Sequence, residues 1–138
     1  MPAHINDEDI FWMSRAIQLA GHGRYTTRPN PCVGCVLVKN GQSIGEGWHY
    51  RAGEPHAEVY AIQSVVGDLK GATAYVTLEP CNHQGRTGPC TQALVNAGVS
   101  RVVYGMQDPN PLVAGQGLDF LVRAGLVVDG HLSNYVMP

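Results

Sequence analysis

The spacing of apolar and polar positions first predicts an amphipathic helix over residues 7–20. Asn6 or Asp7 is suited to cap its start, and glycines follow its end. Within it, apolar side chains recur at the three- and four-residue spacing of a single helix face: Ile10, Met13, Ile17 and Ala20. The pattern therefore predicts that this face packs into the core.

A different pattern follows and predicts a hairpin. Residues 33–38 form a short apolar run with the length and composition of a buried strand. The Asn-Gly pair at Asn40 and Gly41 is typical of a tight two-residue turn. Residues 43–48 are then the returning antiparallel strand.

Beyond the hairpin, helical and strand patterns alternate. Helices are predicted over residues 56–66, 89–98 and 118–124, and strands over 74–78, 101–105 and 126–128. Such alternation favours an α/β fold, with a mostly parallel sheet, an antiparallel hairpin at one edge and helices on both faces. The length of 138 residues suits one domain.

Composition narrows the class of protein. An apolar fraction of 44% supports a full core, while nine scattered Lys and Arg residues at a net charge of −2 argue against a nucleic-acid partner. The N-terminus lacks a signal-peptide pattern, and no run of about 18 apolar residues predicts a membrane span. Four cysteines without a secretion signal indicate a reducing, cytoplasmic setting in which thiols serve metals or catalysis.

Three short segments carry the candidate chemistry. His56 and Glu58 open a predicted helix, Pro-Cys at Cys81 follows a strand, and Pro-Cys at Cys90 opens another helix. Two thiolates and one imidazole leave one tetrahedral position free for water, which is typical of a catalytic site for one Zn²⁺ per chain. Glu58 is the candidate general acid and base.

The spacing of the cysteines refines this prediction. Zinc deaminases of nucleobases carry H-x-E followed by P-C-x-x-C, whereas eight residues separate Cys81 from Cys90 here. The segment TLEPCNHQGRTGPC, with RPNPCVGCVLV, GEGWHYRAGEPHAEV and QDPNPLVAGQG, resembles the deaminase domain of the bacterial riboflavin-biosynthesis protein RibD. The resemblance extends over roughly residues 9 to 130.

This resemblance implies a fold, a reaction and a set of residues. The fold is the three-layer cytidine deaminase-like fold with a five-stranded mixed sheet. The reaction is hydrolytic deamination of diaminohydroxyphosphoribosylaminopyrimidine, a small phosphorylated pyrimidine, to the aminouracil and ammonia. The implied zinc ligands are His56, Cys81 and Cys90, the proton shuttle is Glu58, and the substrate-binding residues are Asn30, His49, His83 and Arg86.

The chain departs from the family pattern at three positions. Cys32 stands where the family varies, Gly88 where proline is common, and Gln116 where a basic residue is frequent. The full-length family joins this domain to a nicotinamide-dependent reductase, for which we expect no counterpart within residues 1–138.

Several alternatives stay open at the sequence level. The chain could deaminate another free base, a nucleotide or tRNA adenosine, or be a zinc-binding scaffold without catalysis. Cys32 and Cys35 resemble a second metal pair, but their place at a buried strand favours a structural role. The oligomeric state also stays open, with a homo-oligomer among the alternatives.

Overall fold

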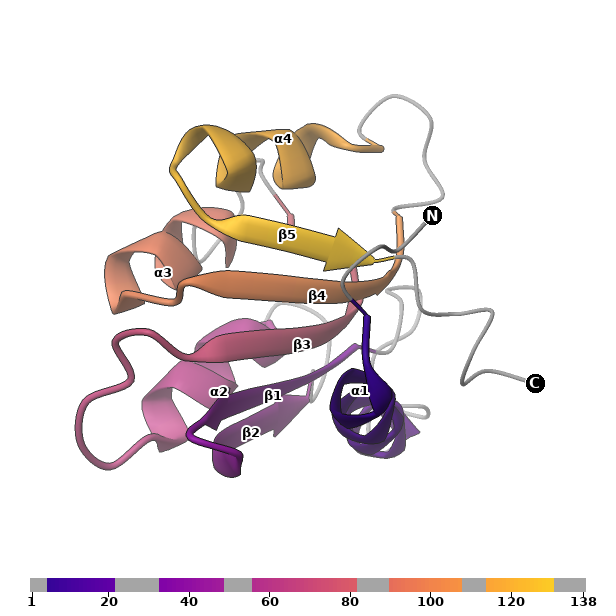
Figure 1. Cartoon of the computed structure of the whole chain (residues 1–138), viewed down its shortest axis with the longest axis vertical. Helices are drawn as coiled ribbons and strands as arrows, with labels where there is room; N and C mark the ends of the chain where they lie inside the picture. The colour runs from indigo at the N-terminus through magenta and orange to yellow at the C-terminus, as the bar shows by residue number, and fades with distance from the viewer. Residues whose placement is uncertain (1–4, 22–32, 49–55, 82–89, 108–113, 131–138) are drawn as a thin grey trace.

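The computed structural model describes residues 5–21, 33–48, 56–81, 90–107 and 114–130. Five strands form one mixed sheet in the order β2-β1-β3-β4-β5 (Figure 1). The elements in chain order are α1 (Asp7–Ala20), β1 (Gly34–Lys39), β2 (Gln42–Trp48), α2 (Ala57–Ser64), β3 (Thr73–Leu78), α3 (Cys90–Ala97), β4 (Arg101–Met106), α4 (Gln116–Arg123) and β5 (Val127–Gly130). The predicted α/β architecture with a five-stranded mixed sheet is confirmed.

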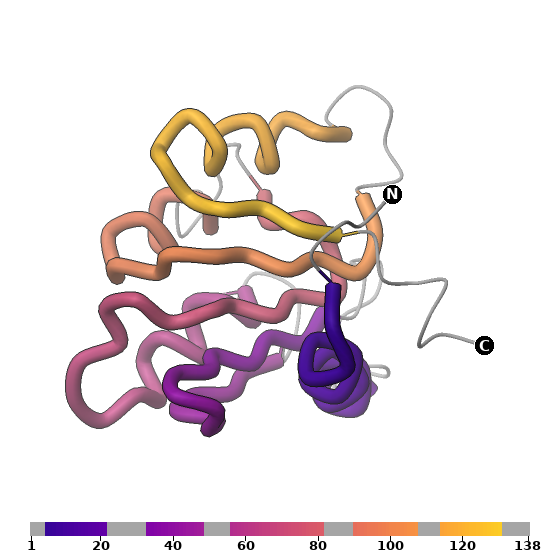
Figure 2. Tube along the Cα trace, viewed as in Figure 1, coloured from indigo at the N-terminus to yellow at the C-terminus, as the bar shows by residue number. Residues whose placement is uncertain are grey.

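The sheet separates two apolar layers, because alternate side chains of a strand point to opposite faces. On one face, Leu37 and Val76 pack with α2, α3 and α4 through Ala61, Leu94 and Leu121. On the other face, α1 alone among the described helices covers the sheet, and its Met13, Ala16 and Leu19 pack on Val36, Tyr75 and Val103. The trace in Figure 2 shows α1 on one side of the strands and the other helices on the opposite side.

Strand directions decide where the later helices begin. The hairpin forms one edge of the sheet, as predicted, and β1 lies on its inner side, antiparallel to both β2 and β3. Strands β3, β4 and β5 are mutually parallel. It follows that β2 runs in the same direction as β3 and β4. The carboxyl ends of the strands that precede α2, α3 and α4 therefore all lie on the same side of the sheet.

Local signals account for the first elements. Asn6 caps α1 in a reciprocal capping box with Asp9, at 2.9 and 3.1 Å, and the helix ends at Ala20 as predicted. At the hairpin, Asn40 and Gly41 both have positive φ, 55° and 77°, as a two-residue primed turn requires. The second helix is shorter than predicted: it ends at Ser64, and Val66 is almost fully exposed.

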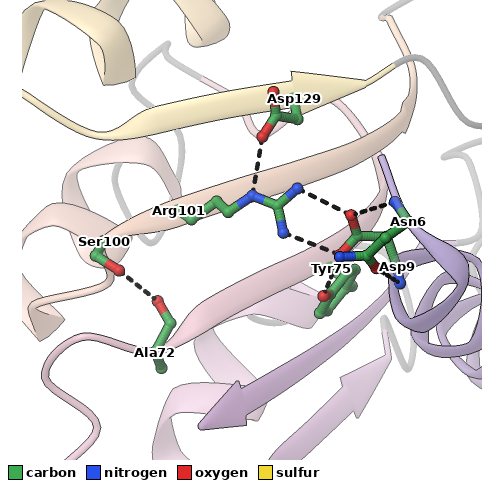
Figure 3. A network of polar contacts seen from close by, with 7 residues as sticks. All are labelled: Asn6, Asp9, Ala72, Tyr75, Ser100, Arg101 and Asp129. Atoms are coloured by element: carbon green, nitrogen blue, oxygen red, sulfur yellow. Dashed lines mark hydrogen bonds and ion pairs between the residues drawn. The ribbon is translucent and has the colours of Figure 1, made fainter. Parts of the chain in front are cut away.

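The buried face of α1 includes Met13 and Ile17 of the predicted stripe but also contains Asp9. Met13 is fully buried, but Ile10 and Ile17 are half-buried, and the buried position in the first turn is the acidic Asp9. Figure 3 shows the reason: Arg101 of β4 donates two hydrogen bonds to the Asp9 carboxylate, each 2.9 Å long. Tyr75 adds a third at 2.6 Å. This network joins α1 to β3 and β4 and rotates the helix so that Asp9 faces the sheet.

Candidate metal centre

His56 is held at the start of α2 by close packing of that helix on β2. It is the N-cap residue, with an extended backbone, and its carbonyl begins the helix by accepting the Val59 N–H at 3.0 Å. Two glycines of β2 allow the approach: a Cβ on Gly47 would lie 2.5 Å from the Ala57 carbonyl oxygen. A Cβ on Gly45 would meet the next turn at 2.6 Å. The helix–strand contact therefore fixes the start of α2, from which the imidazole extends.

Cys81 and Cys90 meet at the start of α3. Cys81 follows β3, and Cys90 is the first residue of α3. The Cys90 backbone N–H donates to Cys81 Sγ at 3.4 Å, and the Thr91 N–H donates to the Cys81 carbonyl at 3.2 Å. The positive end of a helix dipole favours thiolate, so the local fold holds Cys81 in a metal-binding form.

The three predicted ligands come together in space. One ligand atom from each of His56, Cys81 and Cys90 lies within 4.8 Å of the others. His56 Nδ1 is 3.1 Å from Cys90 Sγ and 3.6 Å from Cys81 Sγ. Tetrahedral zinc with ordinary bond lengths separates such nitrogen and sulfur atoms by roughly 3.6 Å. The donor set and its spacing fit zinc, with one coordination position left over.

The two thiols shift each other's pKa in opposite directions. Hydrogen bonding from Cys90 lowers the pKa of Cys81 to about 4, with His56 adding to the effect. The same hydrogen bond, burial and the charge of Glu58 raise the pKa of Cys90. The bond to Cys81 also raises the pKa of His56. A divalent cation bound here would be held by both sulfurs as thiolates, because a coordinating thiol is deprotonated outright.

Glu58 lies beside these ligands and is almost completely buried, at 3% exposure. Burial raises the pKa of its carboxyl to about 7. The charges of Cys81 and His56 shift this pKa in opposite directions, so the carboxyl lies close to the ligand set without belonging to it. A carboxyl of this kind is suited to accept and return a proton near neutral pH.

Of the other candidate residues, the structure describes Cys35 alone. Cys35 is fully buried in the core layer formed by α2, α3 and α4, and burial raises the pKa of its thiol well above its ordinary value. The remaining candidates lie outside the described residues: Asn30, Cys32, His49, His83 and Arg86. Their roles stay predictions.

Sequence reasoning missed Glu79, a buried carboxylate between β3 and Cys81. Its oxygens accept the backbone N–H groups of Gly115 and Gly117, both at 2.9 Å. No local pattern identifies this residue, because its partners are backbone groups more than 30 residues away. The single available signal is an acidic residue placed directly before the Pro-Cys pair.

Comparisons with known proteins agree with this geometry. Residues 6–106 match the family described as the cytidine and deoxycytidylate deaminase zinc-binding region. The chain is 62% identical over 125 residues to riboflavin biosynthesis protein RibD of Escherichia coli, covering 91% of this chain and 34% of that protein. It is 52% identical over 120 residues to the diaminohydroxyphosphoribosylamino-pyrimidine deaminase of Buchnera aphidicola, covering 87% of this chain and 82% of that protein.

A solved structure gives the same result for the fold. Acinetobacter baumannii RibD superposes with a TM-score of 0.90 at 54% identity, over 94% of this chain and 36% of that one. The chain thus spans about a third of the length of the RibD proteins it matches. Within the described ranges, none of the helices has the length and apolar character needed to cross a membrane.

Proposed function

We propose that this chain, which belongs to the zinc-dependent family of cytidine and deoxycytidylate deaminases, deaminates diaminohydroxyphosphoribosylaminopyrimidine in riboflavin biosynthesis. Water replaces the amine on the pyrimidine ring, giving the aminouracil and ammonia. The observation that carries this proposal is the meeting of His56, Cys81 and Cys90 around one point, with the buried Glu58 beside them.

The substrate follows from the relatives. The Buchnera protein, of which this chain covers 82%, is named for this deamination, and the RibD proteins are named for the pathway. Low charge also favours a small molecule over tRNA, because phosphate-backbone binding requires clustered Lys and Arg.

The residues of the site divide into two roles. His56, Cys81 and Cys90 would hold one zinc ion per chain, and the bound ion would supply activation of water near neutral pH. Glu58 takes the proton of the attacking water and passes it to the departing amine. Its burial favours this, because a carboxyl with a pKa near the working pH exists in both forms during the cycle.

The substrate-binding residues are proposed from the resemblance. Asn30, His49, His83 and Arg86 line the substrate pocket. Arg86 binds the ribose phosphate, for which the planar guanidinium is suited, and His83 helps to place the ring or sugar. These assignments concern residues outside the described ranges.

The experiment measures ammonia release by the zinc-loaded chain from the phosphoribosyl pyrimidine, with deoxycytidylate, cytosine and tRNA as competing candidates. We expect turnover on the first substrate alone. Glu58→Gln should keep its zinc and lose roughly 10²–10⁴-fold in kcat, the usual contribution of an acid–base group. Zinc-free wild-type protein from a chelator-free preparation, or full turnover by Glu58→Gln, would contradict the proposal.

A second substitution tests the substrate. Arg86→Ala should lower kcat/KM for the phosphorylated substrate by about ten- to a hundredfold, the value of one charge-assisted contact. The dephosphorylated nucleoside should be affected much less. Equal losses on both compounds would mean that Arg86 shapes its loop and does not bind the phosphate.

A further inference from the structure

A buried carboxylate connects the metal-binding segment to a distant helix. Glu79 lies two residues before Cys81 and is 5% exposed. Its Oε1 accepts the Gly115 N–H and its Oε2 accepts the Gly117 N–H, both at 2.9 Å. These two donors flank the first residue of α4, so each oxygen of the Glu79 carboxylate accepts a hydrogen bond from the start of that helix.

The sequence of α4 does not supply its own cap. Gly115 is the N-cap residue, with φ 84°, and it makes no side-chain capping bond. The first backbone N–H groups of a helix lack partners within it, and its dipole favours a negative charge there. Asp119, the acidic residue of the first turn, is exposed and pairs with Arg123 at 3.1 Å. Glu79 therefore caps α4 from another part of the chain.

The same helix start also packs on the residue before the ligand. A Cβ added to Gly117 would lie 2.0 Å from the Pro80 carbonyl oxygen, so no side chain fits between them. On its other side, the Glu79 N–H donates to the Met106 carbonyl at the end of β4, at 2.9 Å. Glu79 and Pro80 are thus fixed between β4 and α4.

Cys81 itself is held by the start of α3. The Thr91 N–H binds its carbonyl at 3.2 Å, and the Cys90 N–H reaches its sulfur at 3.4 Å. The position of this ligand therefore depends on two helices, one of which is reached through Glu79 and Pro80.

We infer that Glu79 is a positioning residue that sets Cys81 for metal binding and couples the metal centre to the start of α4. The inference rests on the proposed zinc centre. It assigns Glu79 a structural contact with the start of α4 and gives it no part in the reaction. Losing the carboxylate should therefore act on metal affinity and kcat through Cys81, and leave KM little changed.

Glu79→Gln is the direct test, because the amide has the same size but offers a single acceptor oxygen to two N–H donors. Zinc affinity, measured by chelator competition on the full chain, should fall roughly 10- to 100-fold, as is usual for outer partners of metal ligands. The sulfur-to-metal absorption bands of the cobalt-substituted protein should also shift, since they report the geometry at the cysteines. Glu79→Asp, which keeps two acceptor oxygens, should restore part of the affinity.

Asp119→Asn is the matched control. It removes a carboxylate from the first turn of the same helix without touching Glu79 or Pro80, and it should leave both readouts at wild-type values. A folded Glu79→Gln protein with wild-type zinc affinity and cobalt bands would overturn the inference. If that variant does not fold, unchanged bands in Glu79→Asp would overturn it, and shifted bands would support it. Wild-type protein that binds no zinc would instead overturn the proposed function.

Discussion

Replacing Asp9 with Asn should destabilise the folded chain by about 3 kcal/mol, the lower end of the range for breaking a buried ion pair. Asp9 is 1% exposed and accepts two hydrogen bonds from Arg101 and one from Tyr75. The lower end applies because Arg101 keeps a fifth of its side chain exposed and retains its bond to Asp129 at 2.8 Å. Asn also keeps one oxygen that can still accept a hydrogen bond.

The chain provides a matched control in a second Arg–carboxylate pair between α1 and the sheet. Arg15 and Glu46 are 2.9 Å apart, but their side chains are 40% and 29% exposed. Glu46→Gln should therefore cost less than about 1 kcal/mol, because solvent screens the pair. Urea unfolding of the zinc-loaded proteins at pH 7 measures both, provided that the dependence on urea is unchanged. A loss in Asp9→Asn no larger than that in Glu46→Gln would refute the reasoning.

The pH dependence of unfolding provides a second, independent test of the role of Asp9. Burial raises the pKa of Asp9, but hydrogen bonds from Arg101 and Tyr75 outweigh it and hold this pKa below its ordinary value. A carboxyl with a depressed pKa contributes its stability above its unfolded pKa of about 3.9, and loses it as the pH falls through the lower folded value. The gap between wild type and Asp9→Asn should thus be constant near neutral pH and close below about pH 4. A gap that persists there would implicate packing in place of charge.

Two further predictions concern the metal centre. Cys81→Ala should abolish tight zinc binding and lower the melting temperature. Cys35→Ala should keep its zinc and lose only packing energy, because Cys35 lies in the core layer. Metal analysis of both proteins tests this distinction, and equal zinc loss in the two would contradict it. Gly47→Ala should weaken zinc binding, because the added methyl group pushes α2 away from β2. Gly21→Ala is the control, since its methyl group would meet nothing within 4 Å. A folded Gly47→Ala protein with wild-type zinc affinity in chelator competition would contradict the prediction.

The elements that could be predicted from sequence are those with strong local signals. Helix α1 has the predicted bounds because a capping residue and a glycine frame it. The Asn40-Gly41 turn has the predicted backbone because few other residue pairs adopt two positive φ angles. In both cases residues close in sequence determine the conformation.

What the sequence could not indicate depends on partners far along the chain. Apolar spacing placed Ile10 on the buried face of α1, but a carboxylate occupies that face because Arg101 lies 92 residues away on β4. Glu79 was missed for the same reason, since its partners are backbone N–H groups 36 and 38 residues distant. The expectation that charged residues lie at the protein surface fails where a group distant in sequence pairs with the buried charge.

The ligand set was nevertheless predictable, because the motifs that carry His56, Cys81 and Cys90 are local in sequence. The strand directions then explain why the three residues meet. The hairpin pattern does not decide which of its two strands lies at the edge of the sheet. It does decide that β2 runs opposite to β1, and the structure adds that β1 runs opposite to β3. Because β2 and β3 consequently point the same way, their carboxyl ends lie on the same side of the sheet. His56 and Cys81 follow β2 and β3 in the chain, and their ligand atoms lie within 4.8 Å of that of Cys90, the first residue of α3. If β2 ran in the opposite direction, its carboxyl end would lie at the other end of the strands, roughly 20 Å away. His56 would then be too far from the cysteines for a single ion to bind all three.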